Sequence, residues 1–306
     1  MERTGKQAGT LLLTLAALAT GLLPLLADAN RSALFDPDWT GHAHYHTSMV
    51  IVIGLELALL ALWLLWRVRG SFGVSFASLL LAIFWGGYVA AQFVPGVALQ
   101  SQVAPNAAQI SPNLWLLQVA IGGAPVGLTL NLWLILGMLA LVLVGYALAR
   151  TPAPRPRPRY EGRRSGRIML SVLALITLVG APVFDFNADH VFNPNWPPYA
   201  RYHVAVHIPV TMALMASVLW LLWHTWSRTK PDTTFGLAVA LVMAFWLTFY
   251  TAELVPGTAN VDPGQSVPNA FGFQVYQLTA AIPFTLLVAL AVFLYVRNRT
   301  HVRATA

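Results

Sequence analysis

Residues 185–203 read DFNADHVFNPNWPPYARYH, and residues 28–46, which lie 157 positions earlier, read DANRSALFDPDWTGHAHYH. Eight of the nineteen aligned residues are identical, and they include the uncommon types Trp, Tyr and His. The match continues in the next apolar segment, where the motif WLLW begins at Trp63 and again at Trp220. Self-similarity at a fixed offset indicates a duplicated structural unit, so we expect two similar halves.

The composition indicates a membrane protein. Hydrophobic residues make up 57% of the 306 residues and charged residues only 9%, whereas a typical soluble domain has about 25% charged residues. So few charges cannot cover a surface that faces water, which excludes a soluble enzyme, a nucleic-acid-binding domain and a disordered chain. The chain has no Cys, which excludes disulfides, thiolate nucleophiles and thiolate metal ligands.

Eight segments are apolar over the about 20 residues that a helix needs to cross a bilayer. They lie at residues 9–27, 46–66, 72–94, 114–148, 168–186, 203–226, 234–255 and 270–296. The fourth is longer than one crossing needs, and we expect its part before Pro125 to precede the spanning helix. The predicted fold is an all-α integral membrane protein with eight transmembrane helices. It divides into a first four-helix repeat (1–150), a Pro/Arg-rich linker (151–167) and a second four-helix repeat (168–306).

Because each repeat has an even number of helices, both are expected to cross the membrane in the same direction, as parallel repeats. With a cytoplasmic N-terminus, sixteen of the eighteen Lys and Arg residues fall on the cytoplasmic side, and only Arg31 and Arg201 fall outside. This distribution follows the positive-inside rule. We expect a multi-pass protein of the inner (plasma) membrane, with both termini and the linker in the cytoplasm.

The clearest candidate site combines His203, His207 and Glu253, near the outer ends of two helices. The two histidines are spaced i, i+4, on one helix face, and ionisable groups in a membrane normally face the bundle interior. In one interpretation Glu253, kept protonated by desolvation, donates a proton and a neutral histidine accepts one. In a second, the three residues bind a divalent metal ion. In a third, they form a hydrogen-bonded cluster that ties helix ends together. The sequence itself requires no cofactor.

Other polar residues are candidates for substrate contacts. They are His46, Glu56, Gln92, Asp185, Asn187, His190 and Gln274. In the first half, Val50 takes the position of His207. Gln92 likewise takes the position of Glu253. We therefore expect any chemistry to be centred in the second half.

The first half also contains two further histidines and one glutamate within a predicted helix. His42 and His44 are predicted to be interfacial residues rather than ligands, because side chains in an HxHxH run diverge around the helix. Glu56 lies about ten residues, roughly 15 Å, inside its helix. It should be neutral or paired there, either beside a substrate or against an amide.

The leading interpretation is a protein that binds or converts a lipid-like small molecule by acid/base chemistry, in a cavity near the extracytoplasmic face. Its partners would be membrane lipids and that molecule, and not nucleic acid. The alternative is a transporter or carrier with its pathway at the repeat interface, lined by Glu56, Gln92, Glu253 and Gln274. A non-catalytic structural subunit is the third interpretation.

The segment FNPNWPPYARYH, from Phe192 to His203, resembles a family of functionally uncharacterised bacterial and fungal polytopic membrane proteins. In that family a helix is followed by D-x-N and then by an FNPxWPPHAxFH-like segment. Tyr199 stands where the family has His, and the first half has His42 there. The resemblance implies a four-helix unit, here fused in tandem, and it carries no activity with it.

The arrangement of ionisable residues is also similar to that of the emopamil-binding (sterol isomerase) group. In that group a four-helix membrane unit uses such residues to move a proton on a lipid. The likeness implies that His203, His207 and Glu253 would take those places.

Overall fold

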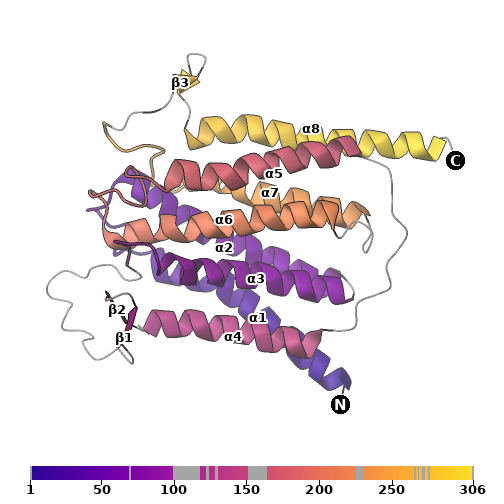
Figure 1. The fold of residues 1–306 in the computed structure, drawn as a ribbon, viewed down its shortest axis with the longest axis horizontal. Helices are drawn as coiled ribbons and strands as arrows, with labels where there is room; N and C mark the ends of the chain where they lie inside the picture. The colour runs from indigo at the N-terminus through magenta and orange to yellow at the C-terminus, as the bar shows by residue number, and fades with distance from the viewer. Residues whose placement is uncertain are drawn as a thin grey trace.

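The chain folds into a bundle of long helices (Figure 1). The computed structural model describes residues 2–68, 70–98, 118–121, 124–127, 130–150, 164–224, 231–264, 267, 269–270, 273–274 and 276–304. Its helices are α1 (Glu2–Asp28), α2 (Gly41–Arg67), α3 (Ser71–Ala91), α4 (Leu130–Ala149), α5 (Arg164–Asp185), α6 (Pro198–Trp223), α7 (Pro231–Glu253) and α8 (Gln277–Ala304). All eight are long and apolar enough to cross a membrane. The predicted all-α fold with eight spanning helices is confirmed, and the chain is a multi-pass membrane protein.

Two short antiparallel strand pairs precede the last helix of each half. Strand β1 (Gln118–Ile121) pairs with β2 (Ala124–Gly127), and β3 (Asn269–Ala270) pairs with β4 (Phe273–Gln274). The part of segment 114–148 before Pro125 does precede the spanning helix, as expected, and that helix begins at Leu130. The predicted segment 270–296 was too long at its start, since α8 begins at Gln277. Pro125 lies in β2, where it pairs with Ala120. Residues 114–117, and 151–163 of the predicted linker, lie outside the described residues.

The central helices are α2, α3, α6 and α7. In the N-terminal half (α1–α4), α1 packs against α2 and α4, and in the C-terminal half (α5–α8), α5 packs against α6 and α8. The halves meet where α2 contacts α6 and α7, and where α3 contacts α6. Many of the large exposed apolar side chains belong to the outer helices α1, α4, α5 and α8. Such a surface is suited to contact with lipid.

Equivalent hydrogen bonds recur in the two halves. In each half, indole N–H groups donate to hydroxyl groups of the first helix: Trp66 to Thr14, Trp85 to Thr20, Trp223 to Ser171 and Trp246 to Thr177. Two Tyr hydroxyls donate to backbone carbonyls of the opposite half: Tyr45 to Phe249, and Tyr202 to Tyr88. Bonds of this kind are expected of two units with a common origin, and they support the proposed duplication.

The repeated segments form the α1–α2 and α5–α6 connections. They lie at the end of the bundle opposite the start of α1 and the end of α8 (Figure 1). In each connection an Asn side chain bonds to the backbone on both sides of a turn. Asn30 donates to the carbonyl of Ala27 and accepts from the amide of Ser32. Asn187 does the same with Phe184 and Asp189. These turns reverse the chain directly after α1 and α5.

Candidate functional site

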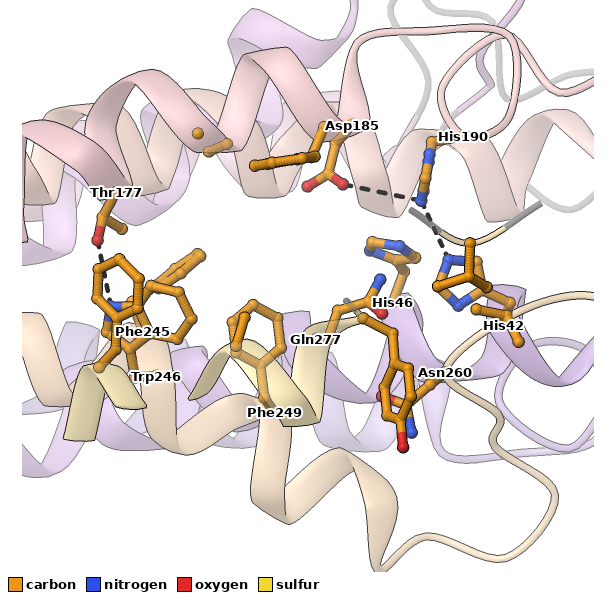
Figure 2. A pocket seen from close by; sticks show the side chains of 18 of the residues that line it. His42, His46, Thr177, Asp185, His190, Phe245, Trp246, Phe249, Asn260 and Gln277 are labelled. Atoms are coloured by element: carbon orange, nitrogen blue, oxygen red, sulfur yellow. Dashed lines mark hydrogen bonds and ion pairs between the residues drawn. The ribbon is translucent and has the colours of Figure 1, made fainter. Parts of the chain in front are cut away.

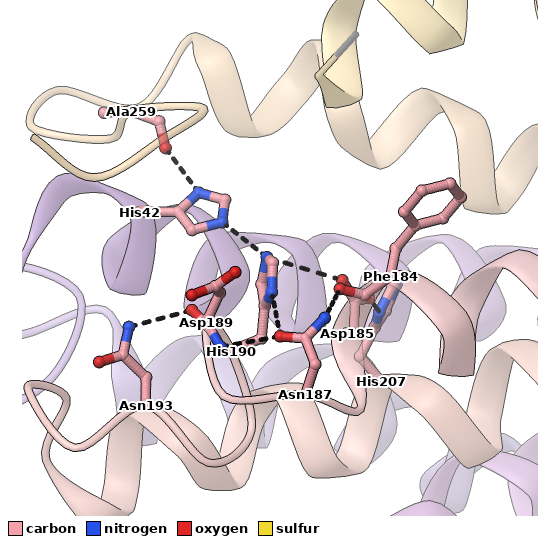
Figure 3. A network of polar contacts seen from close by, with 9 residues as sticks. All are labelled: His42, Phe184, Asp185, Asn187, Asp189, His190, Asn193, His207 and Ala259. Carbon is pink, nitrogen blue, oxygen red and sulfur yellow. Dashed lines mark hydrogen bonds and ion pairs between the residues drawn. The ribbon is translucent and has the colours of Figure 1, made fainter. Parts of the chain in front are cut away.

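Four histidines and one aspartate meet at the end of the bundle where the repeated segments lie. His42 and His46 come from the first turns of α2, His207 from α6, Asp185 from the last residue of α5, and His190 from the α5–α6 connection. Figure 3 shows the side chains of His42, Asp185, His190 and His207 directed toward one another. The spacing i, i+4 places His42 and His46 on one face of α2. We call these five residues the His/Asp cluster.

The distances within the His/Asp cluster are short. The Nε2 atoms of His42 and His190 lie 3.1 Å apart. Asp185 lies between two histidines, with Oδ1 3.9 Å from Nε2 of His190 and Oδ2 3.7 Å from Nδ1 of His207. His42, His46 and His207 are each 1% exposed. The cluster therefore brings imidazole nitrogens and carboxylate oxygens together in a nearly solvent-free space.

Outer partners hold His42 and His190 in place. His42 Nδ1 donates to the carbonyl of Ala259 at 3.1 Å, and the amide of Ala259 in turn donates to the carbonyl of Gly41 at 2.8 Å. This approach needs glycine, because a Cβ on residue 41 would lie 2.8 Å from Cβ of Ala259. His190 Nδ1 donates to Oδ1 of Asn187 at 3.2 Å. The two backbone bonds of Asn187 assign its amide orientation, so Oδ1 is the acceptor.

Two other histidines of the cluster lack hydrogen bonds. Both ring nitrogens of His46 and of His207 are buried without a hydrogen-bond partner among the described residues. Buried polar atoms in proteins nearly always have partners. Trp196 packs against the cluster, with its ring centroid 5.4 Å from that of His42 and 5.8 Å from that of His46. The nitrogens of His46 therefore remain available to a ligand, whereas Nδ1 of His207 lies beside Asp185.

Two overlapping groups in the cluster have the geometry to hold a metal ion. One consists of His42, His46 and His190, and the other of His46, Asp185 and His207. In each group the possible ligand atoms lie within 4.8 Å of one another. His46 belongs to both groups.

An apolar cavity of about 370 Å³ extends from the cluster between α5, α7 and α8. Figure 2 shows His42, His46, Asp185 and His190 at one end, and Thr177, Phe245 and Trp246 at the other. Five aromatic side chains of the transmembrane helices line the apolar part: Phe184, Phe245, Trp246, Phe249 and Phe284. The cavity is thus polar at one end and apolar along its length.

The structure does not bring together the predicted trio of His203, His207 and Glu253. Among the described residues, no hydrogen bond or ion pair joins Glu253 to either histidine. Glu253 is exposed at the last position of α7 and accepts a hydrogen bond from Asn260, which lines the cavity. His203 Nε2 lies 3.4 Å from Oδ2 of Asp28 instead. The proton-donor role of Glu253 stays a prediction, without a contact to His203 or His207.

The predicted substrate contacts divide into two sets. His46, Asp185 and His190 line the cavity, and Asn187, which does not line it, accepts a hydrogen bond from His190. The remaining three do not line it: Gln92 donates to the hydroxyl of Tyr202 at 2.6 Å, Gln274 is exposed in β4, and Glu56 lies within α2. None of the four residues predicted for a transport pathway lines this cavity.

His42 was missed as a site residue. His44 does diverge, with its ring nitrogens 3.3 and 2.9 Å from the carbonyl oxygens of Gly257 and Asp36. His42, by contrast, points into the cluster together with His46. The cluster therefore joins both halves rather than belonging to the second half alone. The i, i+4 spacing of His42 and His46 was the available signal, and it is the same spacing that identified His203 and His207.

The fold and this site define a multi-pass membrane protein with a buried polar cluster at one end of an apolar cavity. The model of a family of unknown function, DUF6640, matches residues 169–305. The C-terminal half is therefore similar to a family without an assigned activity, in agreement with the expected resemblance to an uncharacterised family. No curated protein and no solved structure matches the chain.

Proposed function

We propose that the protein binds an amphipathic, lipid-like small molecule in the cavity between α5, α7 and α8. The observation that carries this proposal is the polarity of the cavity: aromatic side chains line its length, and His42, His46, Asp185 and His190 line one end. An apolar tail that comes from the bilayer is held against such a lining by van der Waals packing, since lipid is as apolar as the cavity. A polar headgroup then lies against the His/Asp cluster.

The position of the cavity suits a ligand that arrives from the bilayer. Two of its lining residues on α5, Ile176 and Phe184, are 51% and 62% exposed on the outer surface of the bundle. In a membrane this surface faces lipid. The ligand therefore enters sideways from the bilayer, without crossing water.

The polar end supplies the groups that can exchange a proton with the bound headgroup. These are Asp185, which lines the cavity, and His207, which lies beside Asp185. His42, His46 and His190 also line this end of the cavity and face the headgroup. The distribution of Lys and Arg supports an extracytoplasmic position for this end, by the positive-inside rule. A headgroup with a labile proton would be converted at this polar end of the cavity.

Filling the cavity tests the proposal. Gly180 lines the cavity, and the nearest atoms to an added Cβ are ring carbons of Phe184 at 3.7 and 3.8 Å, so Gly180→Leu occupies ligand space without a backbone clash. Gly137→Leu on α4 is the matched control, because it is an exposed helical glycine with no atom within 4 Å of an added Cβ.

The measurement is mass spectrometry of molecules extracted from the purified chain in detergent micelles. Wild type and Gly137→Leu should release the same amphipathic molecule, and Gly180→Leu should release little of it. Equal amounts from all three proteins would contradict binding in this cavity.

A further inference from the structure

The partners of His42 and His190 leave both of their Nε2 atoms without a proton. The carbonyl oxygen of Ala259 and the amide oxygen of Asn187 can only accept hydrogen bonds, so Nδ1 of each ring carries the hydrogen. A neutral imidazole has one N–H, and each Nε2 therefore presents a lone pair. The two lone pairs face each other across 3.1 Å. Neutral rings in this arrangement repel each other unless a cation binds to them.

The same distance suits two ligands of one metal ion. Bonds from Zn²⁺ to imidazole nitrogen are about 2.0–2.1 Å long, which separates two ligands at bond angles of about 90–110° by about 2.8–3.4 Å. Metal-binding histidines typically donate their other N–H to a carbonyl or carboxylate oxygen. His42 and His190 each donate to an oxygen in this way.

His46 provides the third nitrogen. It is 1% exposed, and neither ring nitrogen has a hydrogen-bond partner in the part of the chain that the structure describes. Its ligand atom lies within 4.8 Å of those of His42 and His190. The carboxylate of Asp185, 3.9 Å from Nε2 of His190, balances positive charge at this site.

The equivalent place in the other half has a different set of residues. Asp28 and His203 correspond to Asp185 and His46, but Tyr199 stands in place of His42. There the Tyr199 hydroxyl donates to Asp28, so the aspartate has a hydrogen-bonded partner. Ala33 replaces His190 in the same alignment. The three-nitrogen arrangement is therefore specific to one side of the molecule.

We propose that His42, His46 and His190 bind a divalent transition-metal ion, with Zn²⁺ as the best fit. Imidazole ligands favour Zn²⁺ and other late transition metals over Mg²⁺ and Ca²⁺, which prefer oxygen. Three histidines also leave one coordination position open, as in catalytic zinc sites. All three ligands line the cavity, so the open position faces the bound headgroup. The ion would polarise an oxygen of that headgroup.

Metal analysis of the full chain, with any purification tag removed, tests this proposal. The protein is incubated with Zn²⁺, with Mg²⁺ as comparison, dialysed, and measured by inductively coupled plasma mass spectrometry. Wild type should retain about one Zn²⁺ per chain. His42→Ala, His46→Ala and His190→Ala should each weaken Zn²⁺ binding by at least about 100-fold, more than the loss of an outer partner does.

His44→Ala is the matched control, because His44 lies on the same helix and both of its nitrogens face backbone carbonyls. It should keep the zinc content of wild type. A further measurement uses the wild type alone and so does not depend on whether the variants fold. Zn²⁺, and not Mg²⁺, should raise the unfolding temperature of wild type. Wild type without bound Zn²⁺, or ligand variants that retain it, would overturn the metal site and favour a proton shared by His42 and His190. The assay uses delipidated protein, so its result does not depend on the proposed amphipathic ligand. The metal proposal and the ligand proposal can therefore be contradicted separately.

Discussion

The Nε2 atoms of His42 and His190 face each other at 3.1 Å, and the two residues belong to different halves of the chain. The ring of His42 is oriented by Ala259, from the segment after α7, and the ring of His190 by Asn187, three residues earlier in the same α5–α6 connection. The contact therefore depends on the packing of α2 against the C-terminal half. Neither half alone contains the cluster, so the cluster forms only when the two halves are packed together.

Loss of the Asn187 side chain should weaken metal binding. Asn187→Ala removes the acceptor that fixes the ring of His190, and loss of such an outer partner typically costs about 10–100-fold in metal affinity. Asn30→Ala is the matched control, since Asn30 makes the corresponding turn bonds and is not bonded to a histidine among the described residues. Competition with a chromogenic zinc chelator measures both variants. Equal affinities for Asn187→Ala and wild type would show that this bond does not position His190.

Tyr199→Phe should destabilise the contact between the halves. The variant removes the hydroxyl that donates to Asp28, and a hydrogen bond to a carboxylate contributes about 1.5–3 kcal/mol to the free energy of unfolding. Tyr250→Phe removes a bond between two neutral hydroxyls, to Thr285, and should cost no more than about 1.5 kcal/mol. Denaturation by SDS in detergent micelles gives both values. A smaller loss for Tyr199→Phe than for Tyr250→Phe would contradict the role of Asp28 as a link between the halves.

Equivalent threonines should make similar contributions. Thr20 and Thr177 each accept a hydrogen bond from a Trp indole, at 2.8 and 3.1 Å, and both are buried. Replacement by valine keeps the shape and leaves the indole N–H unpaired, which costs about 1–3 kcal/mol. The same denaturation assay should give values for Thr20→Val and Thr177→Val that agree within about 1 kcal/mol. A cost in only one half would contradict equivalent structural roles for the two positions.

The orientation in the membrane can be tested with single cysteines, because the chain has none. Ala188 lies in the α5–α6 connection, and His224 directly follows α6, at the opposite end of that helix; both are exposed. Ala188→Cys should react with a membrane-impermeant maleimide in intact cells, and His224→Cys only after permeabilisation, since Lys and Arg favour the cytoplasmic side. The reverse pattern would place the His/Asp cluster at the cytoplasmic face.

The number of helices could be predicted because apolar length depends on the chain alone. Each of the eight helices contains enough apolar residues to cross a bilayer. The start of α4 could not be placed in the same way, because the apolar residues before it pair as β1 and β2 instead. Apolar composition does not distinguish a strand pair from a helix, and the local signs of the difference were Pro125 and the Gly122-Gly123 pair between the two runs.

The site was harder to predict, because its members come from two halves. Helical spacing shows which residues share a face, but it does not show which neighbour that face meets. His203 and His207 are one turn apart, and yet they lie beside different aspartates, Asp28 and Asp185. Glu253 was placed with them by its depth along α7, whereas its side chain bonds to Asn260 of the following loop.

The most direct test is an experimental density map of the wild-type chain in lipid nanodiscs. The account predicts elongated density between α5, α7 and α8, with its headgroup in contact with His42, His46 and His190. A map in which side chains fill this space, or in which the three histidines point away from one another, would contradict it.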